Sequence, residues 1–253
     1  MLFVLFSAIG SITVVVINNG VGNVSLNNDS TLIDGINRLQ TINGGNGTMY
    51  LNDNLYTGGG NLNLTFNTRN LIIIGNNSTI MNGSRNSWIF NAINGQLTLI
   101  NVTFINAYYN GQGGALKNTG MLTIVNCTFI NNSAIQGGAI FNRGNLNISG
   151  SSFQDNFRII DGGTIYNNAS NNLNILNSNF MGNYVSGNNI THGGTIYNNY
   201  GSNSRIMNTT FSNNSAYQGA AIFNNAGFNF SIISSRFNKI TMYLDRILLL
   251  EEE

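Results

Sequence analysis

The 253-residue sequence contains no proline, one cysteine and one histidine, and it has no glutamate before Glu251. The single cysteine, Cys127, excludes an internal disulfide framework and a CxxC metal or redox site. We interpret it as a small buried apolar residue. The single histidine, His192, has no second histidine with which to share a metal, so we expect neither a metal site nor a cofactor.

Charged residues are also scarce. They make up 8% of the chain, against about 25% in ordinary soluble domains, and the formal net charge is +1. Lysine and arginine are scattered singly, which argues against nucleic acid and acidic membrane surfaces as partners. Hydrophobic residues still reach 42%, so the chain can bury a core and should fold. Asn, at about one residue in five, is unusually abundant.

The amino-terminal segment is apolar from Met1 to Ile17 and ends at Asn18-Asn19-Gly20. This run is shorter than the ~20 residues needed to span a bilayer, and it fits the hydrophobic region of a signal peptide. No lysine or arginine precedes it, so a buried strand is the alternative. We expect residues 1–22 to be a signal peptide or a hydrophobic amino-terminal segment, and the protein to be extracellular or at the cell surface.

The strongest pattern is a repeat in the second half of the chain. Its opening is Gly-Gly-Ala/Thr-Ile-x-Asn in the commonest form, and successive openings are 24, 25, 31 and 26 residues apart. The longest spacing contains an inserted loop from Ser186 to His192. The five openings begin at Gly113, Gly137, Gly162, Gly193 and Gly219.

Between these openings the chain alternates apolar and polar residues and then reaches a Phe, as in LTIVNCTF. Alternation with a period of two predicts strands, and no stretch carries a sustained 3.6-residue pattern. Each repeat should form two or three short strands that can bury their apolar face only by stacking. We therefore predict an all-β fold, a right-handed single-stranded parallel β-helix of about nine turns at ~4.8 Å per turn.

Stacking would place equivalent residues of successive turns above one another. An Asn amide can donate to the amide on one side and accept from the amide on the other, which would explain the abundance of Asn. The sixth residue of every opening predicts an Asn ladder: Asn118, Asn142, Asn167, Asn198 and Asn224. A second Asn position follows the Phe by three residues, at Asn132, Asn156, Asn183 and Asn214. The Phe positions predict an aromatic ladder: Phe104, Phe129, Phe153, Phe180, Phe211 and Phe237.

The regular pattern covers only part of the chain. We assign residues 23–94 to a cap and irregular amino-terminal rungs, 95–238 to the regular β-helix, and 239–253 to a divergent or truncated tail. Atypical terminal repeats are common in solenoids, because the open ends of the core must be covered.

GGAIFN and GGTIYN, with the following NCTFINN and NTTFSNN blocks, resemble the repeat of chlamydial polymorphic outer-membrane proteins. The chain as a whole is similar to methanogen adhesin-like proteins that carry this repeat, over roughly residues 30 to 238. The resemblance implies a β-helix of the pectin-lyase-like fold, secreted or attached to the cell surface and engaged in adhesion. It implies glycans or proteins of host or neighbouring cells as partners, and no catalytic residues. We expect a monomer.

Two other functions stay open. A polysaccharide lyase or hydrolase with this fold would need clustered carboxylates and a basic partner. No acidic pair recurs within one rung, and the nearest grouping is Asp155 and Asp161 around Arg158. The other alternative is a non-functional, truncated fragment of a larger surface protein. We favour a non-enzymatic adhesin-like protein that presents a lateral face.

The residues expected to contact a partner lie in two loops. One is the AYYN turn with Tyr108 and Tyr109, whose rings could face outward and stack on sugars or partner proteins. The other is the inserted loop, which contains Asn188 and His192.

Overall fold

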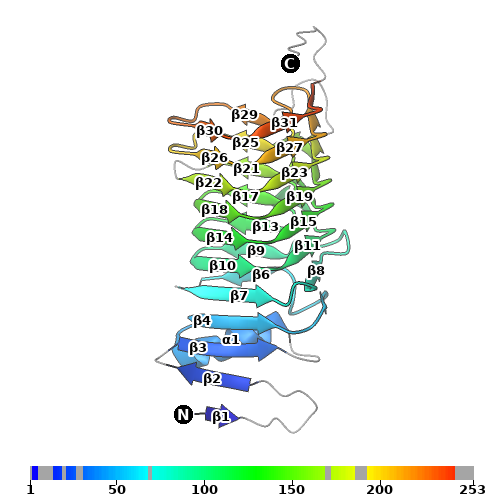
Figure 1. Cartoon of the computed structure of the whole chain (residues 1–253). Coiled ribbons are helices and arrows are strands. Elements are labelled where there is room, and N and C mark those ends of the chain that lie inside the picture. The colour runs from blue at the N-terminus through cyan, green and yellow to red at the C-terminus, as the bar shows by residue number, and fades with distance from the viewer. Residues whose placement is uncertain are drawn as a thin grey trace.

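The computed structural model describes residues 2–4, 14–18, 21–26, 31–67, 70–168, 172–185 and 193–242. They form a coil of stacked, parallel β-strands (Figure 1). The predicted parallel β-helix is confirmed. It has about eight turns, one fewer than expected from the sequence. Each complete turn passes through four sheets, which we call walls 1 to 4 in chain order.

Wall 1 contains the long alternating segments. Its apolar positions stack in register, so that Leu97 lies beside Leu122 and Leu99 beside Ile124. Strands β1 and β2 are antiparallel to their neighbours, and the sheet is parallel from β3 onward. In spatial order, the strands are β1 (Leu2–Val4), β2 (Val14–Asn18), β3 (Val21–Leu26), β4 (Gly47–Leu51), β7 (Leu71–Gly75), β10 (Gln96–Ile100), β14 (Met121–Val125), β18 (Asn145–Ser149), β22 (Leu173–Leu176), β26 (Arg205–Met207) and β30 (Ser231–Ile233).

Wall 2 carries the repeated Phe at the centre of each three-residue strand from β11 onward, pointing into the core. Its strands are β5 (Leu55–Tyr56), β8 (Ile80–Asn82), β11 (Thr103–Ile105), β15 (Thr128–Ile130), β19 (Ser152–Gln154), β23 (Asn179–Met181), β27 (Thr210–Ser212) and β31 (Arg236–Asn238).

Wall 3 begins later than the others, because the described residues of the first rungs form no strand here. Its strands are β12 (Tyr108–Gln112), β16 (Ser133–Gln136), β20 (Phe157–Asp161), β24 (Tyr184–Val185), β28 (Ser215–Ala216) and β32 (Thr241–Met242). The prediction that the AYYN segment forms a turn was wrong, because Tyr108 and Tyr109 begin a strand that pairs with β16. A full turn accordingly has four strands, not two or three.

Wall 4 contains the end of each glycine-rich opening. Its strands are β6 (Leu64–Phe66), β9 (Phe90–Ile93), β13 (Leu116–Asn118), β17 (Ile140–Asn142), β21 (Ile165–Asn167), β25 (Ile196–Asn198) and β29 (Ile222–Asn224). The two positions of an opening require glycine for different reasons. Gly137 has a positive φ of 66°, whereas a Cβ on Gly138 would collide with the carbonyl oxygen of Gly163 in the next turn.

The turns between walls explain a further part of the Asn content. The residue between walls 1 and 2 adopts a left-handed conformation in every regular turn, and it is most often Asn, as at Asn126 with φ 51°. The residue between walls 2 and 3 does the same, as at Asn131 with φ 55°. Asn tolerates this conformation better than other residues that carry a side chain, apart from Asp.

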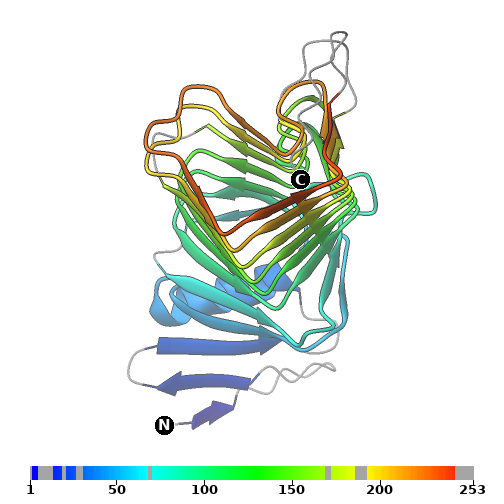
Figure 2. The ribbon, with the colours of Figure 1, turned by 45° about the horizontal axis from the view of Figure 1, so that its top comes forward.

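The structure also contains a helix that we did not expect. Helix α1 (Leu32–Asn43) connects β3 to its parallel neighbour β4 and lies behind both strands at the amino-terminal end of the coil (Figures 1 and 2). It starts at a capping box, in which Thr31 and Asp34 each accept a hydrogen bond from the other's backbone N–H, and Gly44 ends it. Leu32 and Leu39 belong to the main core, so the helix takes the place of the missing walls in this turn.

Candidate functional site

The five ladder Asn residues predicted from the openings lie in one buried column. The side-chain amide of Asn118 donates to Oδ1 of Asn142 over 2.6 Å, and the remaining three links measure 2.6, 2.6 and 2.7 Å. Asn224, in the last of these turns, is exposed, whereas the other four are fully buried. Buried amides that satisfy one another in this way stabilise the stack without any charge.

The second Asn position forms a parallel column at the turn into wall 3. Asn132 donates to Asn156, which donates to Asn183, which donates to Asn214, over 3.0 to 3.1 Å. Each amide also donates to the carbonyl oxygen of a wall 2 Phe one turn back, as Asn156 does to Phe129 over 3.0 Å. These side chains tie successive turns together inside the wall and are not available to a ligand.

The six predicted Phe residues also lie in one column, with ring centroids 4.6 to 5.0 Å apart and ring planes within 11° of parallel. The first five rings are fully buried, and Phe237 in the last turn is 44% exposed. The column is therefore a structural element of the core. In the turns before the last, the side chains of the Asn ladder and of the Phe ladder are buried and cannot contact a ligand in solvent.

The predicted contact residues have different outcomes. Tyr108 is 41% exposed on wall 3, and Tyr109 packs on Trp88 with ring centroids 3.5 Å apart. Asn188 and His192 lie outside the described residues. Of the two neighbouring tyrosines, only Tyr108 presents much of its surface.

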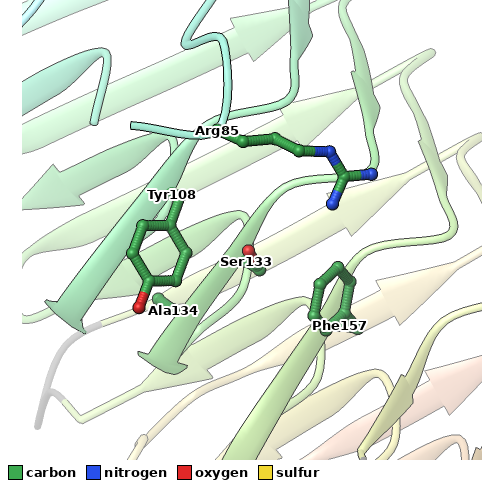
Figure 3. A pocket seen from close by; sticks show the side chains of 5 residues that line it. All are labelled: Arg85, Tyr108, Ser133, Ala134 and Phe157. Carbon is green, nitrogen blue, oxygen red and sulfur yellow. The ribbon is translucent and has the colours of Figure 1, made fainter. Parts of the chain in front are cut away.

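Wall 3 has a cavity beside Tyr108. It has a volume of about 230 Å³. Figure 3 shows the rings of Tyr108 and Phe157 on either side of Ser133, with the Arg85 side chain reaching over the same space. Its lining consists of Arg85, Tyr108, Ser133, Ala134 and Phe157.

The cavity follows from the sequence of one stacked column. Strand register places Tyr108, Ser133, Phe157 and Tyr184 at equivalent positions of four successive turns. Phe157 and Tyr184 stack with centroids 5.4 Å apart, as adjacent aromatic residues in a solenoid do. Serine, the one small residue in this run, leaves a ring-sized gap between Tyr108 and Phe157.

Arg85 is held at the cavity by its backbone. Its N–H donates to the carbonyl oxygen of Asn106 over 2.7 Å, at the turn that leads directly into Tyr108. Ser84 and Arg85 both have positive φ, 53° and 60°, so the loop after β8 turns sharply at this point. The Arg85 side chain is exposed, and within the described part of the chain it forms no ion pair.

Ser133 is the buried polar group of the cavity. It is only 6% exposed, and its side chain lines the cavity. The cavity thus combines two aromatic rings, the hydroxyls of Ser133 and Tyr108, and one guanidinium.

Acidic groups do not gather anywhere in the described residues. No set of three His, Cys, Asp or Glu side chains there is arranged to hold a metal ion. Asp155 lies at an exposed corner with φ 51°, and Arg158 and Asp161 belong to strand β20, where their side chains are outside the described part. Within the same part of the chain, no helix is long and apolar enough to cross a membrane.

Cys127, the single thiol in the sequence, lies in the core. It is 1% exposed, and burial raises the pKa of its thiol to about 11. Its Sγ donates to the carbonyl oxygen of Val125 over 3.3 Å. The thiol is therefore protonated at neutral pH and closed to a substrate.

Comparison of the chain with protein-family models, with curated proteins and with solved structures gave no match.

We did not predict Arg85, Ser133 or Phe157 as site residues from the sequence. The signal for two of them was present in the repeat. Aligning the residue four places after each wall 2 Phe would have produced the column Tyr108, Ser133, Phe157, Tyr184 and Ser215, in which serine interrupts the rings. Arg85 belongs to an irregular amino-terminal rung, and no repeat position marks it.

Proposed function

We propose that this protein is a secreted or surface-displayed, non-enzymatic adhesin-like β-helix that binds partners through the outer face of wall 3. The observation that carries the proposal is the column of aromatic residues on that face. Tyr108 and Tyr184 are 41% and 38% exposed, and the half-buried Phe157 stacks between Tyr184 and the cavity. Aromatic residues grouped on a surface are typical of binding sites for glycans and proteins.

Several sequence features support the same proposal. The GGAI and FxxN repeats resemble those of adhesin-like proteins, and the apolar first 22 residues fit a signal peptide. A small net charge and the absence of a basic patch in the sequence favour neutral contacts over nucleic acid. Each contact would be weak, and many copies on one cell would multiply the overall strength of attachment.

Binding of the labelled chain to immobilised glycans and to whole cells tests this function. We expect a variant with Tyr108→Ala and Tyr184→Ala to lose at least five-fold in retained protein. Tyr50→Ala is the matched control, because Tyr50 is 39% exposed but lies in β4 of wall 1. It should bind like the unmodified chain.

Two outcomes would contradict the proposal. Incubation with acidic and neutral polysaccharides could release shortened or unsaturated products, which would show an enzyme. Alternatively, the unmodified chain could bind no cell and no glycan although its melting transition shows that it is folded, which would favour the non-functional fragment.

A further inference from the structure

We propose that the cavity at Ser133 binds a single six-membered sugar ring that carries a carboxylate, inserted between the rings of Tyr108 and Phe157. This inference rests on the proposed function, because it names the class of ligand that the outer face of wall 3 recognises. The spacing of the column, the Ser133 hydroxyl and the position of Arg85 support it.

The spacing selects the size of the ligand. Tyr108 and Phe157 are two turns apart, which is about 9.6 Å at ~4.8 Å per strand. Stacked rings elsewhere in the coil have centroids 4.6 to 5.4 Å apart, so one ring midway across this gap, about 4.8 Å from each neighbour, would contact both. A chair-shaped pyranose is thicker, and its C–H groups can contact both aromatic faces. The volume of about 230 Å³ leaves room for one such ring.

The polar groups select the chemistry. The Ser133 hydroxyl lines the cavity and can exchange hydrogen bonds with a sugar hydroxyl there. The Arg85 guanidinium extends over the opening (Figure 3). It offers five N–H donors in a planar arrangement that matches a carboxylate. A neutral sugar would leave these donors to water.

An aromatic side chain of a peptide is the rival occupant, and the structure favours the sugar over it. Aromatic rings stack in this wall at the spacing of one turn, as Phe157 and Tyr184 do at 5.4 Å. A planar ring bound at Ser133 would fit the same spacing, so the polar groups of the cavity, and not its size, separate the two occupants. A sugar ring would also use the hydroxyl at the base, which a phenylalanine ring would not.

Titration of the full chain with methyl β-D-glucuronide, followed by ligand-observed NMR, tests the proposal. We expect a Kd of about 1 to 10 mM, as for single sugar rings with few contacts. Methyl β-D-glucoside, the same ring without the carboxylate, should bind at least ten-fold more weakly. Arg85→Gln should remove the preference for the glucuronide and leave the affinity for the glucoside unchanged.

Ser133→Phe provides the sharpest variant, because the new ring would occupy the gap and continue the stack from Tyr108 to Tyr184. It should abolish binding of both sugars. Ser215→Phe is the matched control, since Ser215 occupies the same column next to Tyr184 and outside the cavity. It should bind the glucuronide normally. If Ser133→Phe does not fold, Tyr108→Ala replaces it and should weaken binding of both sugars at least ten-fold.

Three results would overturn the proposal: equal affinity for the two sugars, unchanged binding by a folded Ser133→Phe protein, or tighter binding of 4-hydroxyphenylacetate than of the glucuronide. The last would reassign the cavity to an aromatic side chain of a peptide. Failure here can be told apart from failure of the proposed function. A protein that attaches to cells through Tyr108 and Tyr184 but ignores the glucuronide remains an adhesin with another ligand.

Discussion

The side-chain amide of Asn142 donates a 2.6 Å hydrogen bond to Oδ1 of Asn167, its counterpart one turn along the coil. The same amide also donates to the carbonyl oxygen of Gly144, over 2.8 Å, and Oδ1 of Asn142 accepts from Asn118. One fully buried residue therefore satisfies polar groups in three consecutive turns. The ladder is a set of mutually dependent bonds, and its interior members should matter more than its end.

Replacing Asn142 by Leu should lower the free energy of unfolding by about 3 kcal/mol or more, because the buried amide of Asn118 keeps only its backbone acceptors and the oxygen of Asn167 loses the Asn142 donor. Denaturant titration followed by circular dichroism measures the change. Asn224→Leu is the control at the exposed end of the ladder and should cost less than about 1 kcal/mol. Equal losses at the two positions would show that the ladder adds nothing beyond local contacts.

The second glycine of each opening should tolerate no side chain where a further turn lies above it. Gly138→Ala should destabilise by about 1 to 3 kcal/mol, because its Cβ would meet the carbonyl oxygens of Gly163 and Phe157. The last opening carries Ala220 at this position, and wall 4 ends at β29 in that turn. Ala220→Gly should therefore change the unfolding midpoint little. A well-folded, unshifted Gly138→Ala protein would contradict the close approach of the two turns.

Two buried threonines should lower the stability of the regular region. The hydroxyls of Thr164 and Thr195 have no hydrogen-bond partner among the described residues, and both threonines occupy a column that is alanine at Ala115 and Ala139. Thr164→Val keeps the shape and removes the hydroxyl, so it should raise the free energy of unfolding by about 1 kcal/mol. Thr209→Val is the control, since the Thr209 hydroxyl donates to the carbonyl oxygen of Met207 over 3.0 Å. That variant should be less stable than the original protein, and a gain in both would refute the explanation.

Cys127 should react with a disulfide reagent only after unfolding, because its thiol is buried and its pKa is raised to about 11. The raised pKa also makes stability depend on alkaline pH. The thiol of the unfolded chain ionises as the pH rises past its ordinary pKa of 9.0, while the thiol of the folded chain stays protonated up to its raised pKa. The thiol's contribution to the free energy of unfolding is therefore fully present below pH 9 and is lost between about pH 9 and 11. Cys127→Ser should remove the part of the decline that begins near pH 9, whereas Tyr56, whose pKa burial raises from 10.0 to about 12, still lowers stability above about pH 10.

The serine variant should fold, because Ser151 and Ser178 occupy the same column in the next turns and each donates to a carbonyl oxygen two residues back, over 2.9 Å. If Cys127 of the folded protein were labelled as fast as Cys127 of the unfolded chain, this part of the core would open readily. An unchanged alkaline decline in the serine variant would assign the pH dependence to other groups.

The sequence predicted the parts of the fold that repeat. Equivalent positions such as Asn142 and Phe129 recur with a near-constant spacing, and stacking converts that spacing directly into contacts. Helix α1 was missed because it occurs once, although Thr31 and Asp34 form a capping box and Leu32, Ile36 and Leu39 have helical spacing. The cavity was missed because it results from an interruption: Ser133 breaks an aromatic column, and Arg85 comes from a turn without a repeat.

The longest repeat shows how the coil accommodates change. Ile165, Tyr166 and Asn167 pair in register with Ile196, Tyr197 and Asn198, although 31 residues separate the equivalent positions, against 24 or 25 in the preceding turns. Additional residues between walls 3 and 4 thus leave the hydrogen-bonded columns on both sides undisturbed. Insertions at this corner can vary in length and composition at little cost to folding, which would let the contact surface diversify while the scaffold stays the same.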